Sequence, residues 1–153
     1  MSTRKIVFGF VAVASALLMA STAFGAEVVV TSGASKAGKV SYAIDVVSSG
    51  DVASFNFSVQ SPLISNAKSS MGGCLSDLPK GWSGGCNVVG DKMYVFATSD
   101  TLEPLAAGVH SVGIVHFNGG ALVKEGSNVV IGDMFVGDVR GNAISSEAVT
   151  SDR

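Results

Sequence analysis

Strict alternation of apolar and polar residues in two neighbouring segments constrains this fold more than any other feature of the sequence. The segments run from Lys39 to Val47 and from Val52 to Gln60, and a turn-forming Ser-Ser-Gly-Asp sequence separates them. The apolar faces carry Val40, Tyr42, Ile44 and Val46 in the first segment and Ala53, Phe55, Phe57 and Val59 in the second. A period of two residues indicates β-strands with one buried and one solvated face. The pair therefore predicts an antiparallel sheet whose apolar side needs a second layer to cover it.

Further short strands are predicted along the rest of the chain. They cover residues 27–31, 87–89, 93–96, 109–118, 128–136 and 143–149, and a tight Gly-Asp turn at 90–91 makes a hairpin of the second and third. Residues 61–85, with two of the three prolines, are predicted to be irregular. This spacing predicts an all-β fold, an antiparallel jelly-roll-like β-sandwich of about eight or nine strands.

The expected core follows from the same alternation. Tyr42 and Tyr94 lie on apolar faces of their strands and are predicted to be inside. The strand 109–118 is apolar on both sides and is predicted to be covered on both faces. The core should contain Ile44, Val46, Phe55, Phe57, Val59, Ile114, Phe117, Ile131 and Phe135, and the solvent-facing set should contain Ser54, Asn56 and Ser58.

The first 25 residues have the three-part pattern of a cleaved signal peptide. Two basic residues precede an uncharged apolar run from Ile6 to Met19, and small residues follow it. The run is shorter than the roughly 20 residues that a membrane-spanning helix needs. We therefore expect cleavage between Gly25 and Ala26 rather than a membrane anchor. A single domain over residues 26–153 is then predicted, secreted or periplasmic, with no membrane association after cleavage.

The charge of the mature chain argues against a nucleic-acid partner. Without the signal peptide, eight basic residues remain against twelve acidic ones, which gives a net charge of −4. No cluster of Lys or Arg occurs along the chain. Binding to a polyphosphate backbone depends on such a basic patch, so nucleic acid is excluded as the expected partner.

Cys74 and Cys86 are the only cysteines, and we predict that they form a disulfide. An exported chain meets an oxidising compartment, where a bonded pair is the default. The bridge would close a loop of 13 residues and contribute about 3 kcal/mol in the chain-entropy model. The alternatives are free thiols or half of a metal site, but no further cysteine and no nearby histidine would complete such a site.

No arrangement of residues in the sequence indicates catalysis or a bound cofactor. Serines are plentiful, but none stands in a Gly-x-Ser-x-Gly nucleophile elbow, and the carboxylates are scattered, mostly in turns. His110 and His116 are six residues apart on one face of a predicted strand, about 20 Å from each other, so one metal ion cannot bind both. Residues 138–142 lack the alternating oxygen ligands of an EF-hand loop. We predict a protein that is not an enzyme and has no cofactor or metal; a hydrolase whose carboxylate pair forms only in three dimensions is the alternative.

Trp82 is the one residue that suggests a ligand by itself. It is the only tryptophan, and it lies in a Gly- and Ser-rich stretch inside the predicted disulfide loop. An exposed indole ring on a loop stacks on a sugar or fills a partner's pocket, and Asp77, Ser83 and Asn87 are the polar groups that would flank it. These four residues form the predicted ligand-binding set. The alternative is that the Trp82 ring folds back over the end of the sandwich as an apolar plug.

Three stretches of the sequence resemble the cohesin domain. Residues 54–63 are similar to the cohesin strand that enters a Tyr-Asp-Pro-x-x-Leu turn, although Ser61 stands where the family has its Asp. Residues 104–117 are similar to the Gly turn that leads into a Leu-x-x-Ile-x-Phe strand, and residues 136–144 to the terminal Asp-x-x-Gly-x-x-Ile hairpin. The resemblance spans residues 27–149 and implies a jelly-roll sandwich, shared with family 3 carbohydrate-binding modules, that binds a partner protein through a sheet face.

The residues and the resemblance together predict a secreted binding module. The leading hypothesis is a cohesin-like domain for protein–protein interaction in the extracellular or periplasmic space. The alternative is a carbohydrate-binding module that acts on polysaccharide through Trp82. A flat sugar-binding strip needs several exposed aromatic rings, and the predicted core leaves few for that purpose, so the protein partner is favoured.

Overall fold

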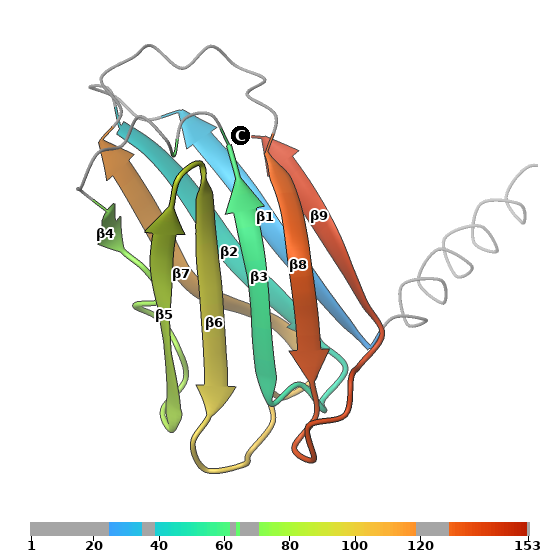
Figure 1. Ribbon diagram of the computed structural model, residues 1–153. Coiled ribbons are helices and arrows are strands. Elements are labelled where there is room, and N and C mark those ends of the chain that lie inside the picture. Colours follow the sequence, from blue (N-terminus) through green and yellow to red (C-terminus); the bar gives the residue numbers. More distant parts are fainter. Residues whose placement is uncertain (1–24, 35–38, 62–63, 65–70, 119–128, 153) are drawn as a thin grey trace, which may run out of the picture.

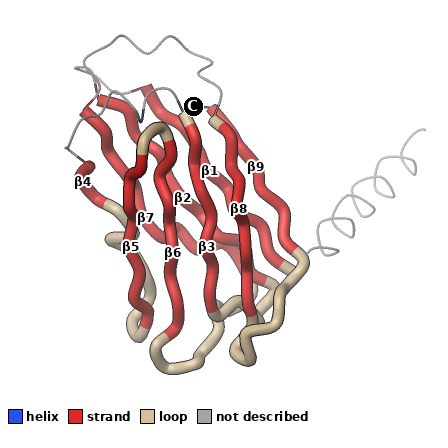
Figure 2. Tube along the Cα trace, viewed as in Figure 1, coloured by secondary structure: helices blue, strands red, loops and turns tan. Residues whose placement is uncertain are grey.

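Strands dominate the computed structural model, which describes residues 25–34, 39–61, 64, 71–118 and 129–152. Nine strands occur within these ranges, arranged as Figure 1 shows. They are β1 (Ala26–Ala34), β2 (Lys39–Ser48), β3 (Ser54–Gln60), β4 (Met71–Gly73), β5 (Trp82–Val89), β6 (Lys92–Ser99), β7 (Gly108–Asn118), β8 (Val130–Gly137) and β9 (Ser146–Asp152). Figure 2 shows that the described connections between them are loops and turns at the ends of the strands. The prediction of an all-β chain is confirmed.

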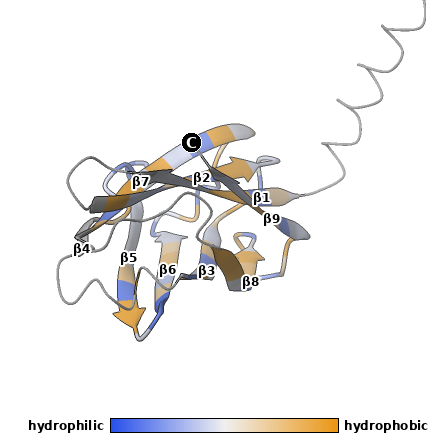
Figure 3. Ribbon diagram, turned by 90° about the horizontal axis from the view of Figure 1, so that it is seen from above, coloured by the Kyte–Doolittle hydropathy of each residue, from blue (hydrophilic) through white to orange (hydrophobic). Residues whose placement is uncertain are grey.

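Two sheets face each other as the layers of a sandwich (Figure 3). One has the strand order β5-β6-β3-β8, and the other has the order β4-β7-β2-β1-β9. Neighbouring strands pair antiparallel except for β1 and β9, which run parallel. The predicted jelly-roll-like sandwich is confirmed, and the β1–β9 pair is its departure from a purely antiparallel arrangement.

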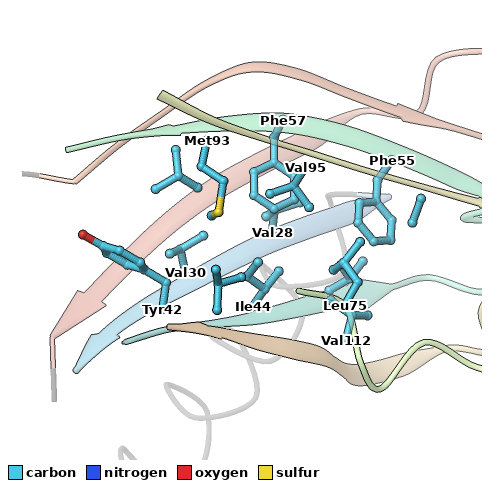
Figure 4. Close-up of a cluster of buried hydrophobic side chains, with 14 of the residues drawn as sticks. Val28, Val30, Tyr42, Ile44, Phe55, Phe57, Leu75, Met93, Val95 and Val112 are labelled. Carbon is cyan, nitrogen blue, oxygen red and sulfur yellow. The ribbon is translucent and has the colours of Figure 1, made fainter. Parts of the chain in front are cut away.

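The space between the sheets is filled by the apolar faces of the alternating strands (Figure 4). Tyr42 and Phe117 meet edge to face with 5.8 Å between ring centroids, and Phe55 stacks on Phe57 at 6.2 Å. Burying one such large side chain contributes about 1.5–3 kcal/mol relative to leaving it exposed. Burial also raises the pKa of Tyr42, and the side chain of Ser61 offsets part of that rise. Of the predicted core, the structure buries Ile44, Val46, Phe55, Phe57, Val59 and Phe117 and half-buries Ile131.

A β-bulge in β7 overturns the predictions for that strand. The pairing with β2 shifts register next to Ile44, so that Val112 is an extra residue, which faces the core. Beyond the bulge the alternation changes phase, and Ile114, predicted to be buried, is 45% exposed. The strand is therefore covered on one face only. His110 and His116, predicted to share a face, point to opposite sides of the sheet for the same reason.

A second bulge, at Asp133 in β8, has the same kind of consequence. Asp133 has a positive φ of 48°, and the pairing of β8 with β3 shifts register there. Phe135, predicted to be in the core, consequently pairs with the outward-facing Asn56 and is 42% exposed. Ser58, predicted to face solvent, is buried and donates its hydroxyl to an Asp133 carboxylate oxygen at 3.0 Å. The error for Phe135 arises because a bulge moves the following residues to the opposite face. Ser58 still points outward beside Tyr94, and it is buried because Asp133 lies over it.

The predicted disulfide between Cys74 and Cys86 is present. Cys74 follows β4 in one sheet and Cys86 lies in β5 of the other, so the bridge joins the two layers along one side of the sandwich. Leu75 follows the first cysteine and is buried in the core. The chain comes this close to β7 because Gly113 has no side chain: a Cβ there would lie 2.6 Å from the Leu75 nitrogen.

The predicted signal peptide lies outside the described residues except for Gly25. Its carbonyl oxygen accepts hydrogen bonds from the Ser49 backbone N–H (3.1 Å) and the Ser49 hydroxyl (2.7 Å). In the part of the chain that the structure describes, no helix has the length and apolar character needed to cross a membrane. The signal peptide, its cleavage site and the domain bounds stay predictions.

Candidate functional site

Aromatic side chains occupy the outer surface of the β5-β6-β3-β8 sheet. In β6, Met93, Val95 and Ala97 point into the core, so Tyr94 and Phe96 point outward. Phe96 is 53% exposed and Tyr94 is 39% exposed, so the prediction that Tyr94 lies in the core is wrong. Exposed rings gathered on one surface are typical of interaction sites rather than of an inert protein surface.

Phe96, Asn56 and Phe135 form one row across three strands. Asn56 in β3 is paired with Phe96 of β6 on one side and with Phe135 of β8 on the other. Neighbouring strands are about 4.8 Å apart, so the two phenylalanines are rooted roughly 10 Å apart, with the exposed Asn56 between them. Each ring lies beside a glycine: a Cβ on Gly85 would be 3.1 Å from the Phe96 ring, and one on Gly137 would be 2.9 Å from the Phe135 ring. Each ring therefore lies over a glycine that has no side chain, and the Asn56 amide between the rings stays accessible to solvent.

We name this surface the front face and define it by the side chains that point outward from its four strands. In Figure 1 it is the side of the nearer sheet that faces the viewer. Its exposed apolar members are Val89, Tyr94, Phe96, Val130 and Phe135, and its polar members are Ser54, Asn56, Ser58, Gln60, Ser83, Asn87, Lys92, Thr98 and Asp133.

The charged groups of the front face are paired with each other. Lys92 Nζ lies 3.4 Å from Asp133 Oδ2, the oxygen that also accepts the Ser58 hydroxyl. The hydrogen bond from Ser58, and then the positive charge of Lys92, hold the pKa of Asp133 below its ordinary value. The centre of the face thus carries no uncompensated charge, which suits an uncharged, apolar partner surface.

The four residues of the predicted ligand-binding set do not share one surface. Trp82 begins β5 and turns inward, where its ring stacks on Phe55 with 6.1 Å between centroids. Ser83 and Asn87 point outward from β5 and belong to the front face. Asp77 is exposed in the loop between β4 and β5, and its backbone N–H donates to β7. Trp82, half-buried against the core, has the position that the plug alternative describes.

The stretch around Trp82 is a strand rather than the predicted irregular segment. Its glycines indicated a loop, but Gly84 is a point where β5 approaches β6 closely, and a Cβ there would overlap the carbonyl oxygen of Phe96. The glycine thus permits strand pairing instead of interrupting it. Because the strand begins at Trp82, the indole ring is fixed on the inner side of a sheet edge.

His110 and Asp138, two further candidate groups of the sequence, make local structural contacts. His110 Nε2 lies 2.7 Å from the Ala106 carbonyl oxygen. Asp138 accepts the backbone N–H groups of Arg140 and Asn142, both at 2.8 Å, and the contacts with Asn142 are the main reason that the pKa of Asp138 is lowered. These hydrogen bonds close the turn after β8. Over the described ranges, no three His, Cys, Asp or Glu side chains are grouped so that they could hold a metal ion.

Sequence reasoning missed the aromatic row for two different reasons. In the middle of β6, residues 93–97 are all apolar, and the only signal was that the polar Lys92 and Thr98 share the face of Tyr94 and Phe96. That signal marks the outer side and was available. For Phe135 the strand offered no comparable signal, because its orientation depends on the bulge before it.

Comparison with known proteins places the chain by fold. No protein-family model matches the sequence, and no curated protein matches it. A non-cellulosomal cohesin from the hyperthermophilic archaeon Archaeoglobus fulgidus is similar in structure, with a TM-score of 0.62 at 15% identity over 84% of this chain and 89% of that chain. The sixth cohesin of scaffoldin B from Acetivibrio cellulolyticus, in complex with a Cel5 dockerin, has a TM-score of 0.61 at 16% identity over 84% and 99% of the two chains.

A type I cohesin–dockerin complex from Clostridium thermocellum contains a third similar structure, with a TM-score of 0.57 at 13% identity over 85% of this chain and 96% of that chain. At these identities the likeness shows the fold alone. The chain has a cohesin-like fold, as the resemblance of its sequence motifs predicted. Two of these three similar cohesins are seen in complex with dockerins, so in those proteins the fold serves protein binding.

Proposed function

We propose that this chain is an exported, non-catalytic binding module and that a partner protein docks on its front face. The observation that carries the proposal is the gathering of five exposed apolar side chains, three of them aromatic, on one outer sheet surface of a sandwich whose core is already filled. Aromatic residues are enriched at protein interfaces, and a few of them supply most of the binding energy.

The cohesin-like fold supports a protein as the partner. Similar cohesins are found in complexes with dockerins, and the uncharged centre of the front face suits an apolar surface of a folded protein. Within the row, the Asn56 amide offers both a donor and an acceptor between the two rings. We assign it the role of selecting a partner that places a matching polar group there, because an unmatched amide buried on docking would weaken binding.

Export is the second part of the proposal. The signal-peptide pattern in residues 1–25 and the Cys74–Cys86 disulfide both support an oxidising compartment outside the cytoplasm. The mature domain would then work in the periplasm or outside the cell.

A polysaccharide is the competing ligand, because exposed rings also stack on sugars. The expectation that few aromatic rings would be exposed is wrong, since Tyr94, Phe96 and Phe135 are exposed on one sheet surface. The front face favours a protein, since Val89 and Val130 extend its apolar surface beyond the rings and Asn56 is the only polar group in the central row. Trp82, on which the sugar hypothesis rested, is half-buried against the core. Polysaccharide binding is therefore the outcome of the experiment below that would contradict a protein partner.

The test compares the mature wild-type protein with the double variant Phe96→Ser/Phe135→Ser. Proteins captured from the extracellular fraction of the source by the immobilised wild type are identified, purified and titrated individually. We expect the double variant to bind the genuine partner roughly 30- to 100-fold more weakly, because truncation of each ring is expected to cost about 1–1.4 kcal/mol of binding free energy. Thermal unfolding and circular dichroism verify that the variant is folded.

Matched controls decide between the outcomes. Val109→Ser/Ile114→Ser removes exposed apolar area from the opposite sheet and should leave this affinity within about twofold. Equal binding of the partner to the wild type and the front-face variant would refute the docking site. A panel of polysaccharides is tested in parallel. If the wild type retains no protein but binds a saccharide, and the front-face variant loses that binding, the ligand of the front face is a glycan rather than a protein.

A further inference from the structure

The outer surface of the β4-β7-β2-β1-β9 sheet also exposes apolar side chains. Val109 is 69% exposed and Ile114 is 45% exposed, and both point away from the core on β7. Strand alternation places four more small aliphatic side chains, each half-buried, on the same surface. We name this surface the back face and define its apolar members as Val29, Ala43, Val47, Val109, Ile114 and Val149.

The apolar members of the back face are contiguous across four strands. Direct cross-strand neighbours are Val47 with Val109, Ala43 with Ile114, and Val29 with Val149. Val29 is paired with Asp45, so it lies diagonally next to both Val47 and Ala43 and connects the three pairs. Directly opposed side chains in a sheet have Cβ atoms about 4.5–5.5 Å apart, so these six form one stripe rather than isolated residues.

Three carboxylates lie within this stripe. Glu27 on β1 is in register with Glu147 on β9 and with Val47 on β2, and Asp45 is the neighbour of Val29. Asp45 accepts the Ser111 hydroxyl at 2.6 Å, and no salt bridge to any of the three exists among the described residues, whose one ion pair is on the front face. No Lys or Arg occurs at the outward positions whose side chains are described. Adjacent like charges are unfavourable in a sheet, so an added cation would be stabilising here.

We propose that the back face is a second docking surface and that its occupant is a basic amphipathic segment of a partner protein. Aliphatic side chains of that segment would cover Val109, Ile114 and Val47, and its Lys or Arg residues would lie against Glu27, Asp45 and Glu147. This assignment requires both components of the back face. The apolar stripe supplies the area that is buried on binding, and the negative charge selects a basic partner because oppositely charged surfaces steer association. The proposal is independent of the front face, and a chain with both surfaces would bridge two proteins.

The probe is a fluorescein-labelled synthetic peptide that alternates Leu and Lys, titrated by fluorescence anisotropy at low salt against the mature protein. Two double variants each remove one component of the back face, Glu27→Gln/Glu147→Gln the charge and Val109→Ser/Ile114→Ser the apolar area. We expect each to weaken binding roughly 3- to 30-fold, the range set by two partly screened charges or two half-exposed aliphatic side chains.

A charge-matched control separates a defined site from general attraction to an acidic protein. Asp77→Asn/Glu103→Gln removes the same number of charges from exposed loop residues that are not members of either face, and we expect less than a twofold change. Phe96→Ser/Phe135→Ser should also leave peptide binding unchanged. Equal weakening in the charge-matched control, weakening in the front-face variant, or unchanged binding in even one of the two back-face variants would each overturn the proposal. Unfolding midpoints of all variants show that they remain folded.

Discussion

The front and back faces of the sandwich expose apolar side chains in different electrostatic surroundings. The front face carries three aromatic rings, and its Lys92 and Asp133 compensate each other. The back face carries only aliphatic side chains, and its three carboxylates have no cationic partner among the described residues. Binding at the front face should therefore be driven by burial of rings and respond little to salt, whereas binding at the back face should weaken as salt rises.

Both faces owe an exposed side chain to a β-bulge. The bulge at Asp133 turns Phe135 outward on the front face, and the bulge at Val112 turns Ile114 outward on the back face. Each bulge interrupts a regular strand that would otherwise bury the residue. The exposure of these two residues is thus built into the backbone, which supports a role in binding rather than incidental surface composition.

The largest expected effect is on stability, and it comes from truncating one buried and one exposed phenylalanine of the front sheet. The two variants test whether the exposed aromatic rings of the front face are available for binding. Phe57 in β3 is buried, and Phe135 in the neighbouring β8 is half-exposed on the other side of the same sheet. Phe57→Ala should lower the free energy of unfolding by about 3–5 kcal/mol because it leaves a cavity. Phe135→Ala should lower it by about 1 kcal/mol or less.

Urea unfolding measures both values, and equal m-values show that the two-state comparison is valid. A loss for Phe135→Ala as large as that for Phe57→Ala would mean that the exposed ring is structural. The front face would then have no surplus of aromatic side chains for a partner, and its contrast with the back face would disappear.

The disulfide gives the next largest effect, and it acts on one edge of the molecule. Cys74–Cys86 ties β5, at the edge of the front sheet, to the segment after β4. Reduction should lower the free energy of unfolding by about 3 kcal/mol. Amide hydrogen exchange should rise first in β5 and around Leu75, whereas β1, β2 and β9, which carry most of the back face, stay protected.

The variant Cys74→Ala/Cys86→Ala controls for other effects of the reductant. It should reproduce the exchange pattern of the reduced protein and show no further change when reductant is added. Uniform loss of protection over both sheets would contradict the local effect and would show that the bridge stabilises the two faces alike.

Much of the fold could be predicted because its strands alternate clearly. In β2 and β3 every second residue is apolar, and burial of Ile44, Val46, Phe55, Phe57 and Val59 follows directly from that pattern. The cysteine pair was equally informative, since only one disulfide is possible with two cysteines. These features are local in the sequence, so no knowledge of the neighbouring strands was needed.

The candidate site depends on features that are not local. Whether Ile114 and Phe135 point inward depends on how many residues their strands insert opposite a partner strand, and the sequence does not state that number. The glycines around Trp82 predict a loop, yet Gly84 allows β5 to pair closely with β6. Surfaces built from register shifts and close strand contacts therefore become visible only when the strands are assembled.

The smallest expected effect concerns the self-compensated charge of the front face. The Ser58 hydroxyl, and then Lys92, lower the pKa of Asp133 in the folded state. A lowered folded-state pKa means that the carboxylate stabilises the fold above its ordinary pKa near 4, and that this contribution disappears as the pH falls through the folded-state value. Because Asp133 is exposed, the contribution is small.

Asp133→Asn keeps an oxygen acceptor for Ser58 and removes the charge, so it isolates the electrostatic part of the interaction. The wild type should be more stable than this variant near pH 7, and the difference should shrink as the pH falls below about 4. Thermal unfolding of both proteins over this pH range gives the measurement. A difference that stays constant down to about pH 2 would show that the carboxylate charge is not stabilised on the front face. The front and back faces would then be alike in leaving their acidic groups without a compensating charge, and the predicted difference in their response to salt would lose its physical basis.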